Sequence, residues 1–185
     1  NIVIEEQVNA AHQQLMSSPG HRANILQKDV THVGIGVYFH QGRYYICQLF
    51  QSREKSHDLS SLRQRLDDWL DAYRRQNEAG ILLQDPLLQS VNQDYAHKMA
   101  QQDRLDYVGV HTLTTLYAER GGAFQSMSTL VLNARNFEDL VYKLEKYRST
   151  LQDPRWERYG LGVTQSNSVS QGHNTLWVTL GLAAD

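Results

Sequence analysis

The stretch LMSSPGHRANILQKDVTHVGIGVYFHQGRYYICQLF, residues 15–50, decides the fold of this 185-residue chain. Its first residues end a segment whose apolar side chains have the spacing of a helix. The pair Pro19-Gly20 disfavours continuation of that helix. Residues 33–39 and 44–50 are rich in β-branched and aromatic residues, as strands are. A glycine between them supplies the positive φ angle of a tight turn. The stretch therefore predicts a helix, a short turn and a β-hairpin, in this order.

Helices and strands are also predicted on both sides of this stretch. Periodicity and caps predict a helix over residues 5–16, a helical turn over 21–26, and a long helix from residue 59 that stops at Gly80. They further predict a helix capped by Asp85-Pro86, a strand over 127–132, a helix capped by Asn136, and strands over 159–165 and 175–182 with a polar loop at 166–174.

An internal repeat relates the two parts of the chain. At an offset of 126 residues, Arg22 meets Arg148, and the Gly-apolar-Gly-Val run that starts at Gly34 meets the run that starts at Gly160. Both segments read as helix, turn and a glycine-containing strand followed by a last strand. This order predicts a duplication.

The run Ser18-Pro19-Gly20-His21-Arg22-Ala23-Asn24-Ile25-Leu26, followed by Val33-Gly34-Ile35-Gly36-Val37, resembles the C-terminal part of a bacterial CAP domain. CAP stands for cysteine-rich secretory proteins, antigen 5 and pathogenesis-related proteins. The resemblance implies an α/β fold, a three-layer α–β–α sandwich with a mostly antiparallel central sheet. It divides the chain into the C-terminal part of a truncated CAP domain (1–52), a linker (53–58) and a diverged CAP-like domain (59–185).

Many CAP proteins hold two His and two Glu in a cleft that can bind zinc or another divalent cation. On the matching positions here, His21 is the second His and Ser18 replaces the second Glu. In the diverged copy Tyr147 stands opposite His21, Leu144 opposite Ser18, and Tyr107 at the place of the first His. We therefore expect no metal site in that copy.

His21 has two interpretations. It is a metal ligand only if a His and a Glu upstream of Asn1 complete the site. Otherwise it hydrogen-bonds the backbone at the turn after Gly20, while Arg22 pairs with a carboxylate. The binding-cleft candidates are His21, Ser18, Arg22, Tyr147 and Tyr107, and no catalytic residue is assigned.

The resemblance implies a secreted or periplasmic protein, and we expect a non-enzymatic binding or interaction module. Its ligand is a small molecule, peptide, glycan or lipid. Two alternatives stay open, a metal-dependent hydrolase whose His/Glu cleft is completed upstream of Asn1, and lipid or sterol binding. The net charge of −2, without a clustered basic face, argues against nucleic acid, and no apolar run reaches the length of a transmembrane segment.

The hairpin would expose apolar surface if it stood alone, because both of its strands are rich in apolar residues. We therefore expect residues 1–52 to pack against an upstream fragment of the same protein, against the second domain or against another chain. Cys47 is the only cysteine, and its apolar neighbours indicate a small packed residue in a strand.

Overall fold

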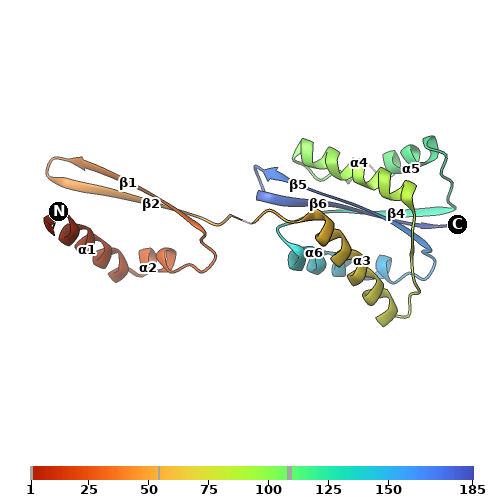
Figure 1. The fold of residues 1–185 in the computed structure, drawn as a ribbon, viewed down its shortest axis with the longest axis horizontal. Helices are drawn as coiled ribbons and strands as arrows, with labels where there is room; N and C mark the ends of the chain where they lie inside the picture. Colours follow the sequence, from red (N-terminus) through yellow and green to blue (C-terminus); the bar gives the residue numbers. More distant parts are fainter. Residues whose placement is uncertain (1, 54, 108–109) are drawn as a thin grey trace. The chain divides into compact units, whose positions relative to one another are not determined.

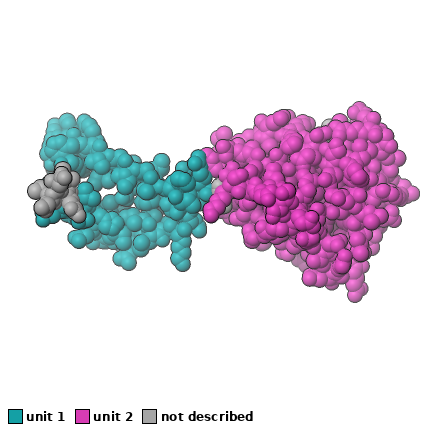
Figure 2. Space-filling model, in the orientation of Figure 1, with its two compact units in different colours: residues 1–53 teal, residues 54–185 magenta. Residues whose placement is uncertain are grey.

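The computed structural model describes residues 2–53, 55–107 and 110–185. Within them, no helix is both long enough and apolar enough to cross a membrane. The chain divides into two compact units, residues 1–53 (unit 1) and residues 54–185 (unit 2), which Figure 2 shows in teal and magenta. The strands form two separate sheets, one in each unit.

Unit 1 consists of two helices followed by a β-hairpin (Figure 1). Its elements are α1 (Ile2–Ser17), α2 (Pro19–Ile25), β1 (His32–His40) and β2 (Arg43–Gln51), each within a few residues of its predicted range. Pro19 begins α2, where the missing N–H of proline has no helical partner to lose. Gln41 and Gly42 form the turn with φ angles of 47° and 74°, and both values fit a type I′ hairpin turn.

The two faces of this hairpin differ because side chains alternate along a strand. One face looks toward α1, and a cavity of about 300 Å³ lies between them, lined by Gln7, Val8, Ala11, Val37, Tyr44 and Ile46. The opposite face carries Gly34 and Gly36 of β1 and, paired with Gly36, Cys47 of β2. Cys47 lies in a strand as predicted, but its side chain is exposed, so the prediction that it is packed is wrong for the described residues.

The sheet of unit 2 has four strands in the order β3-β5-β6-β4. β4 (Ser126–Ala134) and β5 (Arg158–Ser168) both pair antiparallel with β6 (Gly172–Ala184). β3 (Leu83–Gln84) adds two residues at the outer edge of β5 and runs parallel to it. The sheet is therefore mostly antiparallel, as predicted, with one short parallel strand that the sequence pattern did not indicate.

Helices cover both faces of this sheet, because β6 is apolar on both of its faces (Figure 1). One face packs on α3 (Leu59–Gln76), α6 (Phe137–Leu144), the 3₁₀ turn η1 (Glu145–Tyr147) and α7 (Arg148–Leu151). The other packs on α4 (Pro86–Gln102) and α5 (Val110–Glu119). The predicted three-layer sandwich is confirmed in unit 2, whereas the hairpin of unit 1 carries described helices on one face only.

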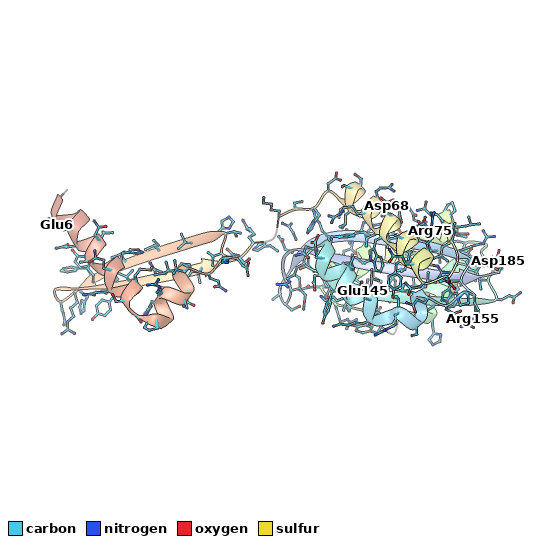
Figure 3. All side chains as sticks on the ribbon, turned by 90° about the horizontal axis from the view of Figure 1, so that it is seen from below. Glu6, Asp68, Arg75, Glu145, Arg155 and Asp185 are labelled. Atoms are coloured by element: carbon cyan, nitrogen blue, oxygen red, sulfur yellow. The ribbon has the colours of Figure 1, made fainter. Side chains whose placement is uncertain are left out.

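Side-chain caps begin two helices of unit 2. Asp58 accepts hydrogen bonds from the hydroxyl and the main-chain N–H of Ser60 at the start of α3, and these bonds keep the pKa of the Asp58 carboxyl below its usual range. Asp85 caps α4 by accepting the N–H of Leu88 at 2.7 Å, and Pro86 follows it as predicted. Asp68 and Arg75 lie on the exposed side of α3 (Figure 3).

Two boundaries differ from the prediction. Helix α3 ends at Gln76 and not at Gly80, because Glu78 has a positive φ of 55° and the Ala79 N–H bonds back to the carbonyl of Arg74. The guanidinium of Arg74 binds the carbonyls of Ala79 and Gly80. The polar loop expected at 166–174 is largely strand, because its polar side chains hold the hairpin together. Ser168 Oγ accepts the N–H of Gln171 at 3.0 Å, for example. The apolar pattern of the sequence also failed to predict helix α5.

Candidate functional site

Ser18 and His21 lie together at the start of α2. Ser18 is the N-cap of this helix, and its Oγ lies 2.9 Å from Nδ1 of His21. This contact is local, three residues apart, and joins two side chains, whereas Ser18 makes no side-chain hydrogen bond to the main chain of the helix. The His21 side chain belongs to an exposed residue. The predicted bond of His21 at this turn thus goes to a side chain.

Arg22 follows on the same helix and is also exposed. It lines an open hollow with Gln13, Met16, Ser17 and Pro19. No ion pair joins Arg22 to a carboxylate among the described residues, so the expected pairing is not found there. In unit 1 the structure therefore gathers Ser18, His21 and Arg22 on one short, exposed segment.

The two candidate tyrosines of unit 2 lie on separate elements. Tyr147 ends η1 and is 37% exposed, whereas Tyr107 lies beyond α4 and is 64% exposed. Neither a hydrogen bond nor a ring contact joins them within the described ranges. Leu144, opposite Ser18 in the repeat, is buried in the core between α3 and the sheet. The positions that the resemblance aligns with ligands of other family members therefore carry two phenols and a core leucine.

The parts of the chain that the structure describes contain no group of three or more His, Cys, Asp or Glu side chains placed to hold a metal ion. Residues 108 and 109, which directly follow Tyr107, lie outside these parts.

A polar cluster on the outer edge of β5 was not predicted. Gln93 of α4 donates from Nε2 to the carbonyl of Val163 and accepts the N–H of Val163 at Oε1, both at 3.0 Å. Arg63 of α3 donates to the carbonyl of Leu161 and to Gln93 Oε1, each at 2.5 Å. Side chains thus provide hydrogen-bond partners for the main chain of β5 along the part of its edge that lies beyond β3. The sequence contains no signal for this, because Gln93 and Val163 are 70 residues apart.

A second unpredicted pair lies between α3 and β5. The Tyr159 hydroxyl donates to Asp67 Oδ1 at 3.0 Å. Burial is the main cause that raises the pKa of Asp67, with Asp68 and Asp71 adding to it, while Tyr159 and Arg63 act in the opposite direction. Burial and the nearby Asp67 also raise the pKa of Tyr159. Asp67 is the one acidic residue lining a small apolar cavity of about 10 Å³ between α3 and the sheet. That volume holds about one water molecule, too little for a substrate.

His57 lies in the segment predicted to be a linker, and it is half-buried rather than solvated. Its main-chain N–H donates to Gln165 Oε1 at 3.0 Å, and its ring Nε2 lies 3.0 Å from the carbonyl of Arg135. Gln165 Nε2 also donates to Ser56 Oγ at 2.7 Å. These bonds fasten residues 56–57 to the sheet of unit 2, so His57 is a structural residue.

Residues 1–50 match the model of the cysteine-rich secretory protein family, CAP. The first 50 residues are therefore similar to CAP sequences, and the match covers the segment that contains Ser18, His21 and Arg22. No curated protein matches the chain.

Two solved structures share the CAP-like fold of this chain. An outer surface protein from Borrelia burgdorferi aligns at 12% identity with a TM-score of 0.56, over 71% of this chain and 98% of that one. An extracellular protein with an SCP domain from Bacillus anthracis aligns at 13% identity with a TM-score of 0.53, over 77% of this chain and 47% of that one. This chain therefore spans about half of the Bacillus protein. At such identities the likeness concerns the fold alone.

Proposed function

We propose that this CAP chain is a secreted or periplasmic binding or interaction module without enzymatic activity, built from two copies of the CAP fold. Residues 1–53 form the C-terminal part of one copy, and residues 54–185 form a diverged second copy. Its ligand is a small molecule, peptide, glycan or lipid. The outer-surface and extracellular origin of the two structural neighbours supports an exported protein.

The observation that carries this proposal is the donor set of unit 2. Leu144 lies in the hydrophobic core, so the position that aligns with the second Glu holds an apolar core side chain, which cannot bind a metal ion. Tyr147 and Tyr107 carry phenols, which are neutral at physiological pH and poor ligands for zinc compared with imidazole and carboxylate. A catalytic zinc site needs three such protein ligands and an open position.

Metal analysis of the purified protein tests the proposal. Wild-type protein and the variant His21→Ala are dialysed against zinc, and bound metal is measured by mass spectrometry of the protein digest. We expect the His21→Ala variant to hold no stoichiometric zinc, because its remaining copy lacks the ligands. Zinc at one equivalent in His21→Ala, lost on a further change in unit 2, would overturn the non-enzymatic assignment of that unit.

The exposed position of His21 favours one second candidate, a metal-dependent hydrolase in unit 1. This activity needs a His and a Glu that are not among residues 1–185 on the matching positions. Zinc bound by a longer polypeptide, and lost in His21→Ala and in no variant of unit 2, would support this candidate. The Ser18→Ala variant is its control, because a serine hydroxyl is not a usual zinc ligand.

A further inference from the structure

The turn end of the β1–β2 hairpin carries four aromatic side chains that are 54–64% exposed: Tyr38, Phe39, Tyr44 and Tyr45. The rings form pairs across the two strands. The ring centroids of Tyr38 and Tyr45 are 6.3 Å apart, and those of Phe39 and Tyr44 are 4.8 Å apart. Residues 38–45, which contain both pairs and the turn between them, are called the aromatic tip below.

The two aromatic pairs lie on opposite faces of the hairpin. Side chains alternate along a strand, so Tyr38 and Tyr45 share one face, and Phe39 and Tyr44 share the other. Tyr44 also lines the cavity next to α1, yet both residues of its pair remain more than half exposed. A helix or a sheet that packs on a hairpin covers one face and would leave one pair in water. A partner that covers both pairs must surround the tip.

The hairpin carries positive charge and no negative charge. Residues 30–53, which include both strands, contain Arg43 and Arg53 but neither Asp nor Glu. Arg43 directly follows the turn, and it forms no ion pair within the part of the chain that the structure describes. The acidic Glu6 of unit 1 belongs to α1 (Figure 3). The aromatic tip therefore complements an anionic surface.

The turn of the β5–β6 hairpin in unit 2 is built differently. Residues 167–174 are polar or glycine except for Val169, and none of them is aromatic apart from a histidine. Hydrogen bonds within the turn hold it together, such as the one from the N–H of Gln171 to Ser168 Oγ at 3.0 Å. A hairpin turn of this chain thus forms without exposed aromatic rings. The rings of the aromatic tip are therefore available for a contact outside the hairpin.

We propose that the aromatic tip docks on the surface of a lipid bilayer that has anionic headgroups. Tyrosine rings favour the interface of a bilayer, where the ring contacts acyl chains and the hydroxyl stays with the headgroups. The same interface surrounds an inserted turn, so it covers both aromatic pairs, and Arg43 then lies among lipid phosphates. The chain lies on the membrane and does not span it. This partner goes beyond the proposed function, because the aromatic tip does not include Ser18, His21 or Arg22.

Co-sedimentation of the 1–185 chain with lipid vesicles tests the proposal. One set of vesicles is phosphatidylcholine alone, and the other is phosphatidylcholine and phosphatidylglycerol in equal parts. We expect binding to the mixed vesicles to be at least about tenfold stronger and to fall as salt is added, because salt screens the attraction between Arg43 and the headgroups. Arg43→Gln should weaken this binding about fivefold, since one basic residue near an anionic surface contributes about 1 kcal/mol.

The double variant Tyr38→Ser, Tyr45→Ser should weaken binding to the mixed vesicles at least about tenfold, because the apolar area buried in the interface sets the strength of such binding. The matched control is Tyr142→Ser, at a similarly exposed tyrosine of α6 in unit 2, and it should leave binding unchanged.

Tyr38→Trp reports on insertion while it keeps an aromatic ring at the tip. The three natural tryptophans, Trp69, Trp156 and Trp177, all lie in unit 2, so the emission of wild type provides the background. We expect the additional emission of Tyr38→Trp to shift to shorter wavelength with mixed vesicles and to be quenched by brominated lipid, because the ring enters the interface. This measurement stays informative if the double serine variant fails to fold.

Equal binding to the two kinds of vesicle, or no binding to either, would overturn the proposal. Tryptophan emission of Tyr38→Trp that does not respond to mixed vesicles would do the same. Self-association of the 1–185 chain that the double serine variant abolishes, without binding to vesicles, would assign the aromatic tip to a second copy and also overturn it. These results are independent of metal content, so this proposal and the proposed lack of enzymatic activity can fail separately.

Discussion

The Nη1 atom of Arg74 donates to the main-chain carbonyl of Leu151 at 2.6 Å, although the two residues are 77 positions apart. Arg74 is 1% exposed, and burial lowers its pKa from the ordinary arginine value. Its other acceptors are the main-chain carbonyls of Ala79, Gly80, Asp153 and Trp156. One guanidinium thus joins the end of α3, the turn after it and the segment that leads into β5.

Arg74→Met should therefore lower the free energy of unfolding of unit 2 strongly. The substitution keeps an apolar stem but leaves several buried carbonyls without donors, at a cost of at least about 3 kcal/mol. Urea unfolding followed by tryptophan fluorescence measures this, because all three tryptophans, Trp69, Trp156 and Trp177, lie in unit 2. Arg75→Met is the control, since Arg75 is exposed and pairs only with Asp71, and it should cost less than about 0.5 kcal/mol. Equal losses would contradict the role of Arg74.

Gly162→Ala should destabilise unit 2, because the added Cβ forces α4 away from the sheet. Such overpacking costs about 1–3 kcal/mol, and more where the obstructing atoms belong to main chain. The same substitution at Gly36 in the 1–185 chain should change stability by less than about 0.5 kcal/mol, since nothing lies above it. Differential scanning calorimetry of the two variants checks the pair. A large loss on Gly36→Ala in this chain would show that other atoms already pack on Gly36.

Asp67 should make the stability of unit 2 increase as the pH falls. Its pKa is raised in the folded state, so folding favours the protonated carboxyl, and this contribution is gained as the pH drops through the folded-state pKa. The Asp67→Asn variant can still accept the Tyr159 hydroxyl but does not titrate. The difference in unfolding free energy between wild type and Asp67→Asn, measured by urea unfolding from pH 7 to pH 4, should therefore move in favour of wild type. Glu119→Gln, at an exposed position of α5, is the control, and a difference independent of pH would exclude the effect.

Gln93→Ala should open the outer edge of β5. The N–H and carbonyl of Val163 would lose their partner, at a cost of about 1–3 kcal/mol, and an exposed strand edge favours pairing between molecules. We expect analytical ultracentrifugation to show dimers or larger species at concentrations where wild type is unchanged in mass. Gln101→Ala, at an exposed position of the same helix, should have neither effect. Identical sedimentation of the two variants would argue against an edge-sealing role for Gln93.

Local features of the chain were predictable because neighbours in sequence cause them. The turn at Gln41-Gly42, the caps at Asp85 and Asn136 and the proline at the start of α2 depend on a few adjacent residues. The candidate pair Ser18 and His21 also proved to be in contact, since three residues at a helix start bring them together. Helix α5 was missed although Leu113, Leu116 and Tyr117 lie at helical spacing on its inward face.

The sequence by itself determined the order of helices and strands, the hairpin turn and the CAP motif of residues 15–50, since each depends on local periodicity or on a contiguous run of residue types. The tertiary structure decided which of these residues are covered. The Gly-x-Gly-Val run is the same in both units, yet Gly162 lies under the backbone of α4 and Gly36 under nothing that is described. The buried bonds of Arg74 and the edge contacts of Gln93 likewise join residues 70 or more positions apart. Such contacts form only when packing brings distant segments together, so no local pattern records them.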